Sequence, residues 1–168
     1  MINIRDVENL NDKKILLRLD LNVPLDKGKI TDPTRIDKII PTLNFLINEK
    51  SKIIILSHVG RPKGKIIDEL SLKPIGEYLE KKLNKKVKLI TKNINQIMNR
   101  DFFDKYEEKI IILENLRFYP EEERNDSNFA KHLASLGDIY VNDAFSCSHR
   151  AHASIHKISK FLPSYSGL

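Results

Sequence analysis

Tryptophan is missing from this sequence, and cysteine occurs once, at Cys147. A single cysteine excludes a disulfide within the chain and fits a reducing compartment. Without tryptophan, and with no basic segment interleaved with aromatic residues, the chain lacks the stacking platforms common in proteins that bind single-stranded nucleic acid. The net charge of +6 comes mostly from lysines on expected helix faces, where they are typical of a solvated surface. No nucleic-acid partner is therefore expected.

Long apolar runs and glycine-rich loops are also missing. No apolar stretch approaches the roughly 20 residues of a membrane span, and residues 1–6 have neither the charge nor the apolar core of a signal peptide. We therefore expect a cytoplasmic protein with no membrane partner. None of the six glycines forms the Gly-x-Gly-x-x-Gly pattern of dinucleotide-binding loops. Residues 60–66 fail as a P-loop, because the glycine spacing is one residue short, Ile66 replaces Ser or Thr, and Pro62 lacks an N–H.

Four short apolar runs each end in a group of polar residues. In 14–24, Ile15-Leu16-Leu17 leads into Asp20, Asn22 and Pro24. The runs 53–56, 110–113 and 138–141 have similar polar exits, and 87–90 is a further short strand candidate. Such runs are typical of strands buried on both faces of a parallel sheet. The polar exits would then lie at the carboxyl ends, where open α/β sheets bind ligands; the alternative is that Asp20 and Asn22 only cap a turn.

Helical patterns alternate with these runs. Apolar residues recur at three- and four-residue spacing in 34–49, 71–83, 93–106, 126–136 and 154–161. The alternation predicts parallel strands joined by right-handed crossovers. With 168 residues, 40% of them hydrophobic, and no linker or repeat, we expect a single α/β domain over residues 1–168. It would be a three-layer α/β/α sandwich with a mostly parallel, Rossmann-like sheet.

Four arginines are placed where they can meet at one crevice. Arg61, Arg117 and Arg150 each follow a predicted strand, and Arg35 opens the first helix. The planar guanidinium group suits carboxylate and phosphate oxygens, so the pattern predicts a small ligand with more than one anionic group. For any single arginine the alternative is a surface ion pair, but that alternative would have to hold four times.

Three histidines, His149, His152 and His156, are spaced three and four residues apart. No Cys or carboxylate completes a tetrahedral metal set at familiar spacing, so no metal site is predicted. A hydrogen-bonding role beside an anion fits these histidines better. For His58 the alternative is that it only holds its own loop. Cys147 is favoured as a small loop residue over a nucleophile.

Five segments then identify a family. They occur in order along nearly the whole chain: RLDLNVP at 18–24, SHVGRP at 57–62, LKP at 72–74, LENLRF at 113–118, and NDAF at 142–145 with HRAH at 149–152. In these segments the chain resembles the amino-terminal, 3-phosphoglycerate-binding domain of phosphoglycerate kinase. The resemblance implies reversible phosphoryl transfer between 1,3-bisphosphoglycerate and MgADP, which gives 3-phosphoglycerate and MgATP.

The resemblance also implies roles for individual residues. Asp20 and Asn22 would hydrogen-bond the glycerate end, arginines and His58 would surround its carboxylate and phosphate, and His152 would support them. Arg35 would be the catalytic residue, because it would stabilise charge on the phosphoryl group in flight. The full set of substrate-binding residues implied by the matched motifs is Asp20, Leu21, Asn22, Arg35, His58, Val59, Gly60, Arg61, Arg117, Arg150 and His152.

Two departures from the family pattern limit what the resemblance implies. The family commonly has Gly-Thr after Asn-Asp-Ala-Phe, whereas this chain has Ser146-Cys147-Ser148, so the loop before Arg150 is expected to differ if that glycine needs a positive φ. The chain also stops at Leu168, about where the family continues into an interdomain helix and a nucleotide-binding domain.

That second departure sets the expected activity. We expect Mg-ADP and Mg-ATP to be cofactors of the full enzyme that this chain alone does not bind. As a monomer the chain would bind 3-phosphoglycerate or 1,3-bisphosphoglycerate weakly, and it would not turn over without a carboxyl-terminal nucleotide-binding domain, because closure of two halves aligns the reactants. The alternative is a freestanding phosphoglycerate-binding module without catalysis.

Overall fold

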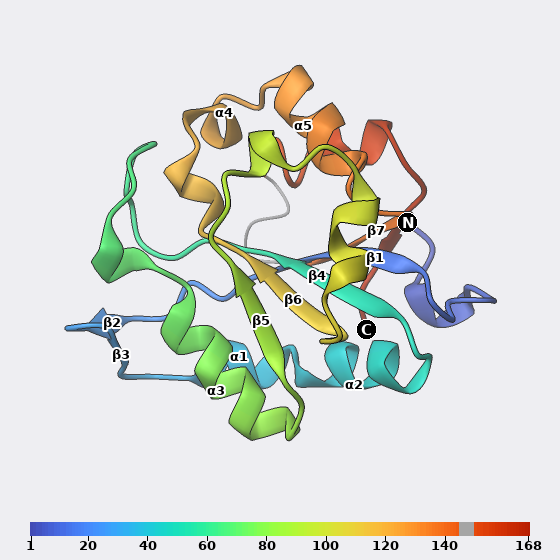
Figure 1. Ribbon diagram of the computed structural model, residues 1–168, viewed down its shortest axis with the longest axis horizontal. Helices are drawn as coiled ribbons and strands as arrows, with labels where there is room; N and C mark the ends of the chain where they lie inside the picture. The colour runs from blue at the N-terminus through green and yellow to red at the C-terminus, as the bar shows by residue number, and fades with distance from the viewer. Residues whose placement is uncertain (145–149) are drawn as a thin grey trace.

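A parallel β-sheet lies at the centre of the computed structural model, which describes residues 1–144 and 150–168 (Figure 1). Its strands are β1 Lys14–Leu19, β4 Lys52–Leu56, β5 Val87–Ile90, β6 Ile110–Leu113, β7 Ile139–Asp143 and β8 Ser164–Ser166. In the described residues the strand order is β5-β6-β4-β1-β7-β8, with every neighbouring pair parallel. The chain leaves β1 toward β4 and later returns to its other side at β7. The carboxyl end of β1 is therefore the switch point, where open α/β sheets bind ligands.

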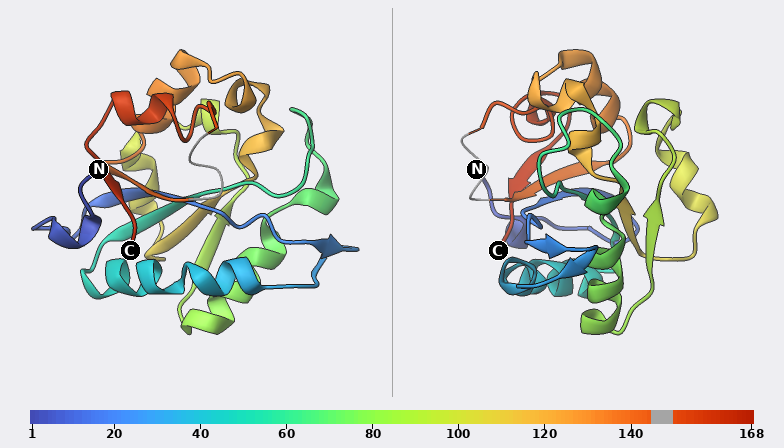
Figure 2. Two further views of the ribbon diagram at one scale, coloured as in Figure 1. Left: turned by 180° about the vertical axis from the view of Figure 1, so that it is seen from behind. Right: turned by 90° about the vertical axis from the view of Figure 1, so that its left-hand side faces the viewer.

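Helices cover both faces of the sheet, which confirms the predicted three-layer α/β fold (Figures 1 and 2). One face carries α1 Thr34–Lys38, α2 Ile40–Asn48 and α3 Lys73–Leu83, and the other carries α4 Pro120–Glu123 and α5 Ser127–Ala134. Because successive residues of a strand point to opposite faces, Ile15 and Leu17 pack in the first helical layer and Leu16 packs with Phe129 in the second. Each such side chain, once fully buried, contributes about 1.5–3 kcal/mol.

The helix predicted at 34–49 is broken in two. Ile39 ends α1 and its N–H bonds back to Ile36 O at 3.2 Å, as in a tightened last turn. Two residues later Pro41 has no N–H to donate to the carbonyl of Asp37 four residues back, and in a continuous helix its ring would clash with that carbonyl. The apolar stripe survives the break, because Ile36, Leu43 and Leu46 all lie in the same core cluster.

The helix predicted at 93–106 is wrong. That segment contains two 3-10 helices, Ile94–Gln96 and Arg100–Lys105. Asn93 accepts from the N–H of Asn95, and Asn99 accepts from the N–H of Asp101, both at 2.9 Å. Asparagine side chains that bond the backbone two residues on close short turns and compete with a continuous α-helix. Ser154–Phe161 likewise shortens to a 3-10 helix at Lys157–Lys160.

Several elements have no counterpart in the sequence-based prediction, among them the short helix α4. A small antiparallel hairpin pairs β2 Leu25–Asp26 with β3 Lys29–Ile30, and both turn residues, Lys27 and Gly28, have positive φ, as a type I′ hairpin turn requires. Strand β8 extends the main sheet beside β7. In the described part of the chain no helix is long and apolar enough to cross a membrane.

Candidate anion-binding site

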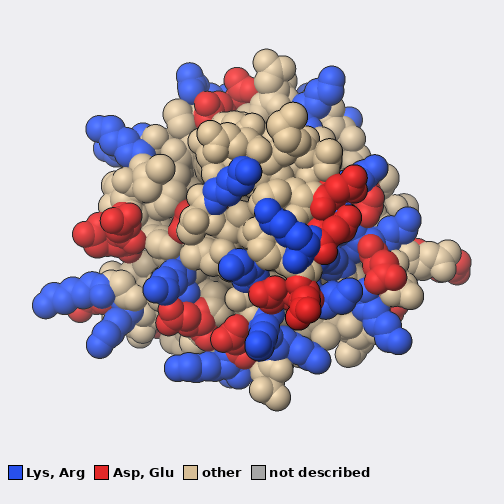
Figure 3. Space-filling model, viewed as in Figure 1, with Lys and Arg blue, Asp and Glu red and all other residues tan. Residues whose placement is uncertain are grey.

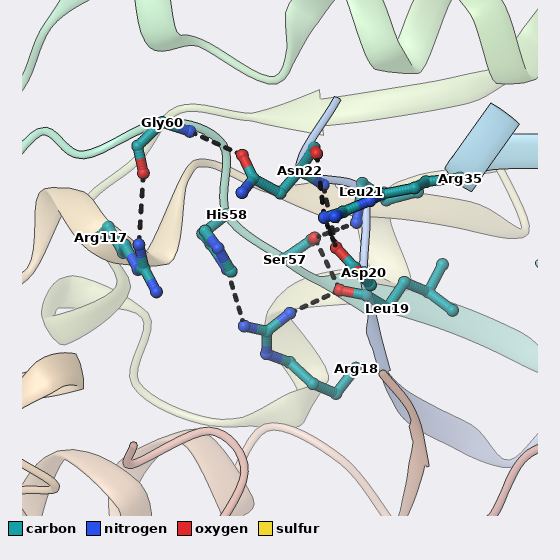
Figure 4. Close-up of polar contacts among 10 residues, drawn as sticks. All are labelled: Arg18, Leu19, Asp20, Leu21, Asn22, Arg35, Ser57, His58, Gly60 and Arg117. Carbon is teal, nitrogen blue, oxygen red and sulfur yellow. Dashed lines mark hydrogen bonds and ion pairs between the residues drawn. The ribbon is translucent and has the colours of Figure 1, made fainter. Parts of the chain in front are cut away.

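The candidate site begins where β1 and β4, which are neighbours in the sheet, both end. The Leu21 N–H donates to Ser57 Oγ at 3.1 Å, and that hydroxyl donates to Leu19 O at 2.7 Å. The Gly60 N–H donates to Asn22 Oδ1 at 3.0 Å (Figure 4). The exits of the first two predicted strands are thus bonded to each other, as the sequence predicts.

Two of the expected site residues are apolar and fully packed. Leu21 is inaccessible to solvent and Val59 is nearly so. Their side chains belong to the first core cluster, and the Leu21 N–H and Val59 O are bonded to Ser57 and Asn115, so both residues anchor the two loops. Their inclusion in the family motif therefore has a packing reason.

Arg35 lies over the first of these loops. Its Nη1 donates to Asp20 Oδ1 and to Asn22 O, each at 3.2 Å (Figure 4). The Arg35 side chain is 50% exposed, against 13% for Asp20. An ion pair this exposed adds at most about 1 kcal/mol to stability, so the contact orients the guanidinium more than it stabilises the fold.

The exit of β6 is joined to the exit of β4 through Asn115. Its Nδ2 donates to Val59 O at 2.8 Å and to Leu70 O at 2.9 Å, while its Oδ1 accepts from the Arg117 N–H at 3.0 Å. Arg117 is buried, and its Nη1 donates to Gly60 O at 3.4 Å. Asn115 was quoted in the sequence motif without a role; the structure makes it the link that fixes Arg117 beside the second loop.

Glu114 is a second supporting residue that sequence reasoning did not single out. Its carboxylate accepts from Ser71 Oγ at 2.6 Å and from the Leu72 N–H at 2.8 Å, just before α3. A carboxylate at a helix N-terminus satisfies donors that the helix itself leaves unpaired. The β6 exit is therefore tied to α3 as well as to β4.

His58 is almost completely buried and lies between two arginines (Figure 4). Burial, and next the positive charges of Arg18 and Arg117, lower the pKa of His58 to about 2. The imidazole is therefore neutral, with Nδ1 2.9 Å from Arg18 Nη2. Arg18 itself is fully buried, and its place beneath the site was not predicted, although it stands in the RLDLNVP motif.

His152 and Arg150 complete the cluster from the β7 side. Burial, followed by the charge of Arg117, lowers the pKa of His152, and the charge of Arg150 adds to this. The charge of Arg150 also lowers the pKa of His58, so the exposed Arg150 lies near both imidazoles. The structure therefore brings His58, Arg117, Arg150 and His152 together.

Some of the expected residues make no contact with described residues, and others lie outside the described part of the chain. Arg61 follows Gly60 and is exposed, and its side chain makes no hydrogen bond or ion pair with described residues. The predictions for His149, for Cys147 and for the Ser146-Cys147-Ser148 departure all concern residues 145–149, which lie outside the described residues. The His156 ring bonds the side chain of Asn125, 31 residues earlier in the chain, with 2.8 Å between His156 Nδ1 and Asn125 Nδ2.

A hollow of about 880 Å³ lies at the opposite end of the strands, where Ser51 and Ile110 stand. It contains none of the expected site residues. Its lysines, such as Lys109, alternate with Asp12 and other acidic residues, and basic and acidic side chains are likewise interspersed over the face in Figure 3. We place the site at the carboxyl ends instead, because Arg35 and Arg117 are held there by the strand exits beside the buried His58, and Arg150 lies close enough to lower its pKa.

Comparisons with known proteins bear on the family and on the fold of this chain. A family model described as phosphoglycerate kinase matches residues 4–168. A phosphoglycerate kinase of Wolbachia pipientis wMel is 55% identical over 168 residues, which are 99% of this chain and 42% of the relative.

Solved structures of the same description have the same fold. The structure of phosphoglycerate kinase from Coxiella burnetii matches with a TM-score of 0.86 and 38% identity over 98% of this chain and 40% of the other. The enzyme from Pyrococcus horikoshii OT3 matches with a TM-score of 0.85 and 29% identity over 99% of this chain and 42% of the other. This chain thus spans about two fifths of the length of the relatives it matches.

Proposed function

Because the chain belongs to the phosphoglycerate kinase family, we propose that residues 1–168 form the domain that holds 3-phosphoglycerate or 1,3-bisphosphoglycerate. In the full reaction a phosphoryl group passes reversibly from 1,3-bisphosphoglycerate to MgADP. The observation that carries the proposal is the convergence of Arg35, Arg117 and Arg150 with a neutral His58 at the switch point of the sheet. Such a cluster leaves positive charge that a small anion with two acidic groups would neutralise.

The contacts support a division of roles around the ligand. Asp20 and Asn22, at the end of β1, would bond the glycerate end, since a carboxylate accepts a hydrogen bond from a hydroxyl group and an amide can donate or accept one. Arg61, Arg117 and Arg150 would hold the charged oxygens. His58 and His152 would act as neutral donors, because burial keeps the pKa of each below its ordinary value.

Arg35 would be the catalytic residue of this domain. Its guanidinium is already oriented by Asp20 and by Asn22 O, yet half of the side chain is exposed toward solvent. A preorganised cation in that position can stabilise charge that develops on the transferring phosphoryl group. In phosphoryl transfer, positioning and charge supply most of the catalysis.

The magnesium nucleotide belongs, in this proposal, to a nucleotide-binding domain beyond the 168 residues, on the same polypeptide or on a separate one. This assignment rests on the family and on the 42% of a relative's length that the chain spans. Residues 1–168 alone would then bind phosphoglycerate weakly, as a monomer of the cytoplasm, without steady turnover.

Calorimetric titration with 3-phosphoglycerate at near-physiological salt tests the proposal. Saturable binding is expected, with loss of binding in Arg35→Ala and Arg61→Ala. Arg100→Ala is the matched control, because Arg100 pairs with Asp138 at 3.3 Å before β7, at the opposite end of the sheet. A folded chain that binds no 3-phosphoglycerate, or a control variant that loses binding equally, would refute the proposal.

A further inference from the structure

A chain of buried hydrogen bonds runs beneath the candidate site and ends at His58. Glu122, in α4, accepts from the N–H of Ser154 at 2.7 Å and also from its hydroxyl. Ser154 Oγ accepts from Arg18 Nε at 2.9 Å, and Arg18 Nη2 meets His58 Nδ1 at 2.9 Å. Glu122, Ser154 and Arg18 are all inaccessible to solvent. Three elements that are far apart in sequence therefore meet in one buried network.

The strand geometry explains why a charged side chain lies inside. Arg18 follows Leu17 on β1 and so points to the opposite face of the sheet from it, into the layer of α4 and α5. A buried guanidinium is costly unless it is paired and hydrogen-bonded. Glu122 is the acidic group of this network, and Ser154 lies between the two charges. Burial raises the pKa of Glu122, and the charge of Arg18 opposes that rise.

The direction of each hydrogen bond in the network is determined by its donors. Arg18 has N–H donors and no acceptor, so Ser154 Oγ accepts its bond and the Ser154 hydroxyl hydrogen is left for Glu122. By the same argument His58 Nδ1 must accept from Arg18. The proton of the neutral imidazole then resides on Nε2.

We propose that Glu122 and Ser154 are positioning residues, which orient Arg18 so that it holds His58 as the Nε2–H tautomer, a hydrogen-bond donor for the phosphoglycerate. The proposal rests on the function proposed above. Without the Ser154 hydroxyl the Arg18 guanidinium loses the partner of its Nε and is held through the bond from Nη1 to Leu19 O, so the donor that faces His58 Nδ1 is less firmly fixed. The ring would then sample both tautomers, only one of which presents Nε2–H.

Ser154→Ala removes the hydroxyl, and Ser154→Thr retains it. Tyr140→Phe is the matched control, because the Tyr140 hydroxyl donates to Ser154 O at 2.7 Å in the same buried cluster but lies off the path to His58. For each folded variant, checked by circular dichroism, nitrogen-15 NMR of the imidazole identifies the tautomer of His58 without any ligand. Calorimetry then measures affinity for 3-phosphoglycerate.

The wild-type chain should show His58 with Nδ1 unprotonated and Nε2 protonated. Ser154→Ala should show a mixture of tautomers and bind 3-phosphoglycerate about fivefold more weakly, which corresponds to about 1 kcal/mol. Ser154→Thr and Tyr140→Phe should resemble the wild type in both measurements. These results would support the positioning role.

Three results would overturn it: a wild-type His58 that carries its proton on Nδ1, an unchanged tautomer in Ser154→Ala, or an equal change in Tyr140→Phe. The first of these decides the question even if Ser154→Ala does not fold. If the wild-type chain binds no 3-phosphoglycerate, the proposed function fails separately, and the ligand-free NMR spectra still support or overturn the positioning role.

Discussion

Substitution of Gly60 by alanine should damage both the fold and the site, and by more than the same change at Gly28. Both glycines have positive φ, +66° at Gly60 and +75° at Gly28, where an L side chain costs about 1–2 kcal/mol. A Cβ at Gly28 would meet nothing within 4 Å, whereas at Gly60 it would lie 2.7 Å from Leu70 Cδ2. Gly28→Ala therefore measures backbone strain alone.

The additional cost at Gly60 follows from that close approach. Overpacking typically costs about 1–3 kcal/mol, and because the obstacle is the end of a leucine side chain that can shift, we expect about 1–2 kcal/mol beyond the loss at Gly28. The entropy that alanine removes from the unfolded chain is similar at the two sites and cancels in the comparison. Urea unfolding of both variants measures the difference in the free energy of unfolding.

The same pair separates stability from binding. The Gly60 N–H bonds Asn22 Oδ1, and Gly60 O accepts from Arg117, so a shift of this loop should weaken 3-phosphoglycerate binding severalfold. Gly28→Ala, in the β2–β3 turn, should leave the affinity unchanged. Equal losses of stability in the two variants, or unchanged affinity in Gly60→Ala, would show that the reasoning about this loop is wrong.

Three further results are expected. Asn115→Ala leaves unpaired the two backbone carbonyls to which Asn115 Nδ2 donates. Its free energy of unfolding in urea should fall by about 2–4 kcal/mol. A fall no greater than that of Asn93→Ala, at an exposed cap, would contradict this. The pKa of His58 is about 2 in the folded chain against an ordinary 6.5. As the pH falls below 6.5, His58 therefore takes up a proton in the unfolded chain but not in the folded chain, and the fold loses stability. The contribution of His58 to the free energy of unfolding should be about 2 kcal/mol smaller at pH 5 than above pH 6.5. His58→Gln should flatten this pH dependence and His156→Gln should not, as unfolding at a series of pH values would show. With a nucleotide-binding domain supplied, Arg35→Ala should lower kcat by about 10²–10³, and a mere rise in KM would refute its catalytic role.

The sequence allowed the architecture and most of the site to be predicted, because both follow from local patterns. Apolar runs such as 53–56 place strands, and the polar residues after them must then gather at one end of a parallel sheet. Asp20, Asn22 and Arg117 are found there. The prediction of a helix at 93–106 was wrong because it relied on the spacing of the apolar residues. It gave too little weight to two asparagines in that segment, which close short turns.

The supporting network could not be predicted in this way, because it depends on contacts between distant residues. Arg18 and Ser154 are 136 positions apart and Ser154 and Glu122 are 32 apart, with no spacing that relates them. Glu122 also stands among three consecutive glutamates in 121–123, a pattern typical of a solvated helix start. Only the packing of α4 against the loop after β7 separates the buried carboxylate from its exposed neighbour Glu123.

The buried residues beneath the loops bear on how the proposed site would bind its ligand. The residues expected to touch the ligand lie on loops, and loops position side chains well only when a rigid layer holds them. Here Asn115, Glu114 and the Glu122–Ser154–Arg18 network tie each strand exit to a helix or to a neighbouring exit. Because these ties exist without a ligand, Arg117 and His58 are already oriented, so under the proposed function less ordering is required when phosphoglycerate binds. A site of this kind should keep its geometry between free and bound states, and His58 should show the same tautomer in both.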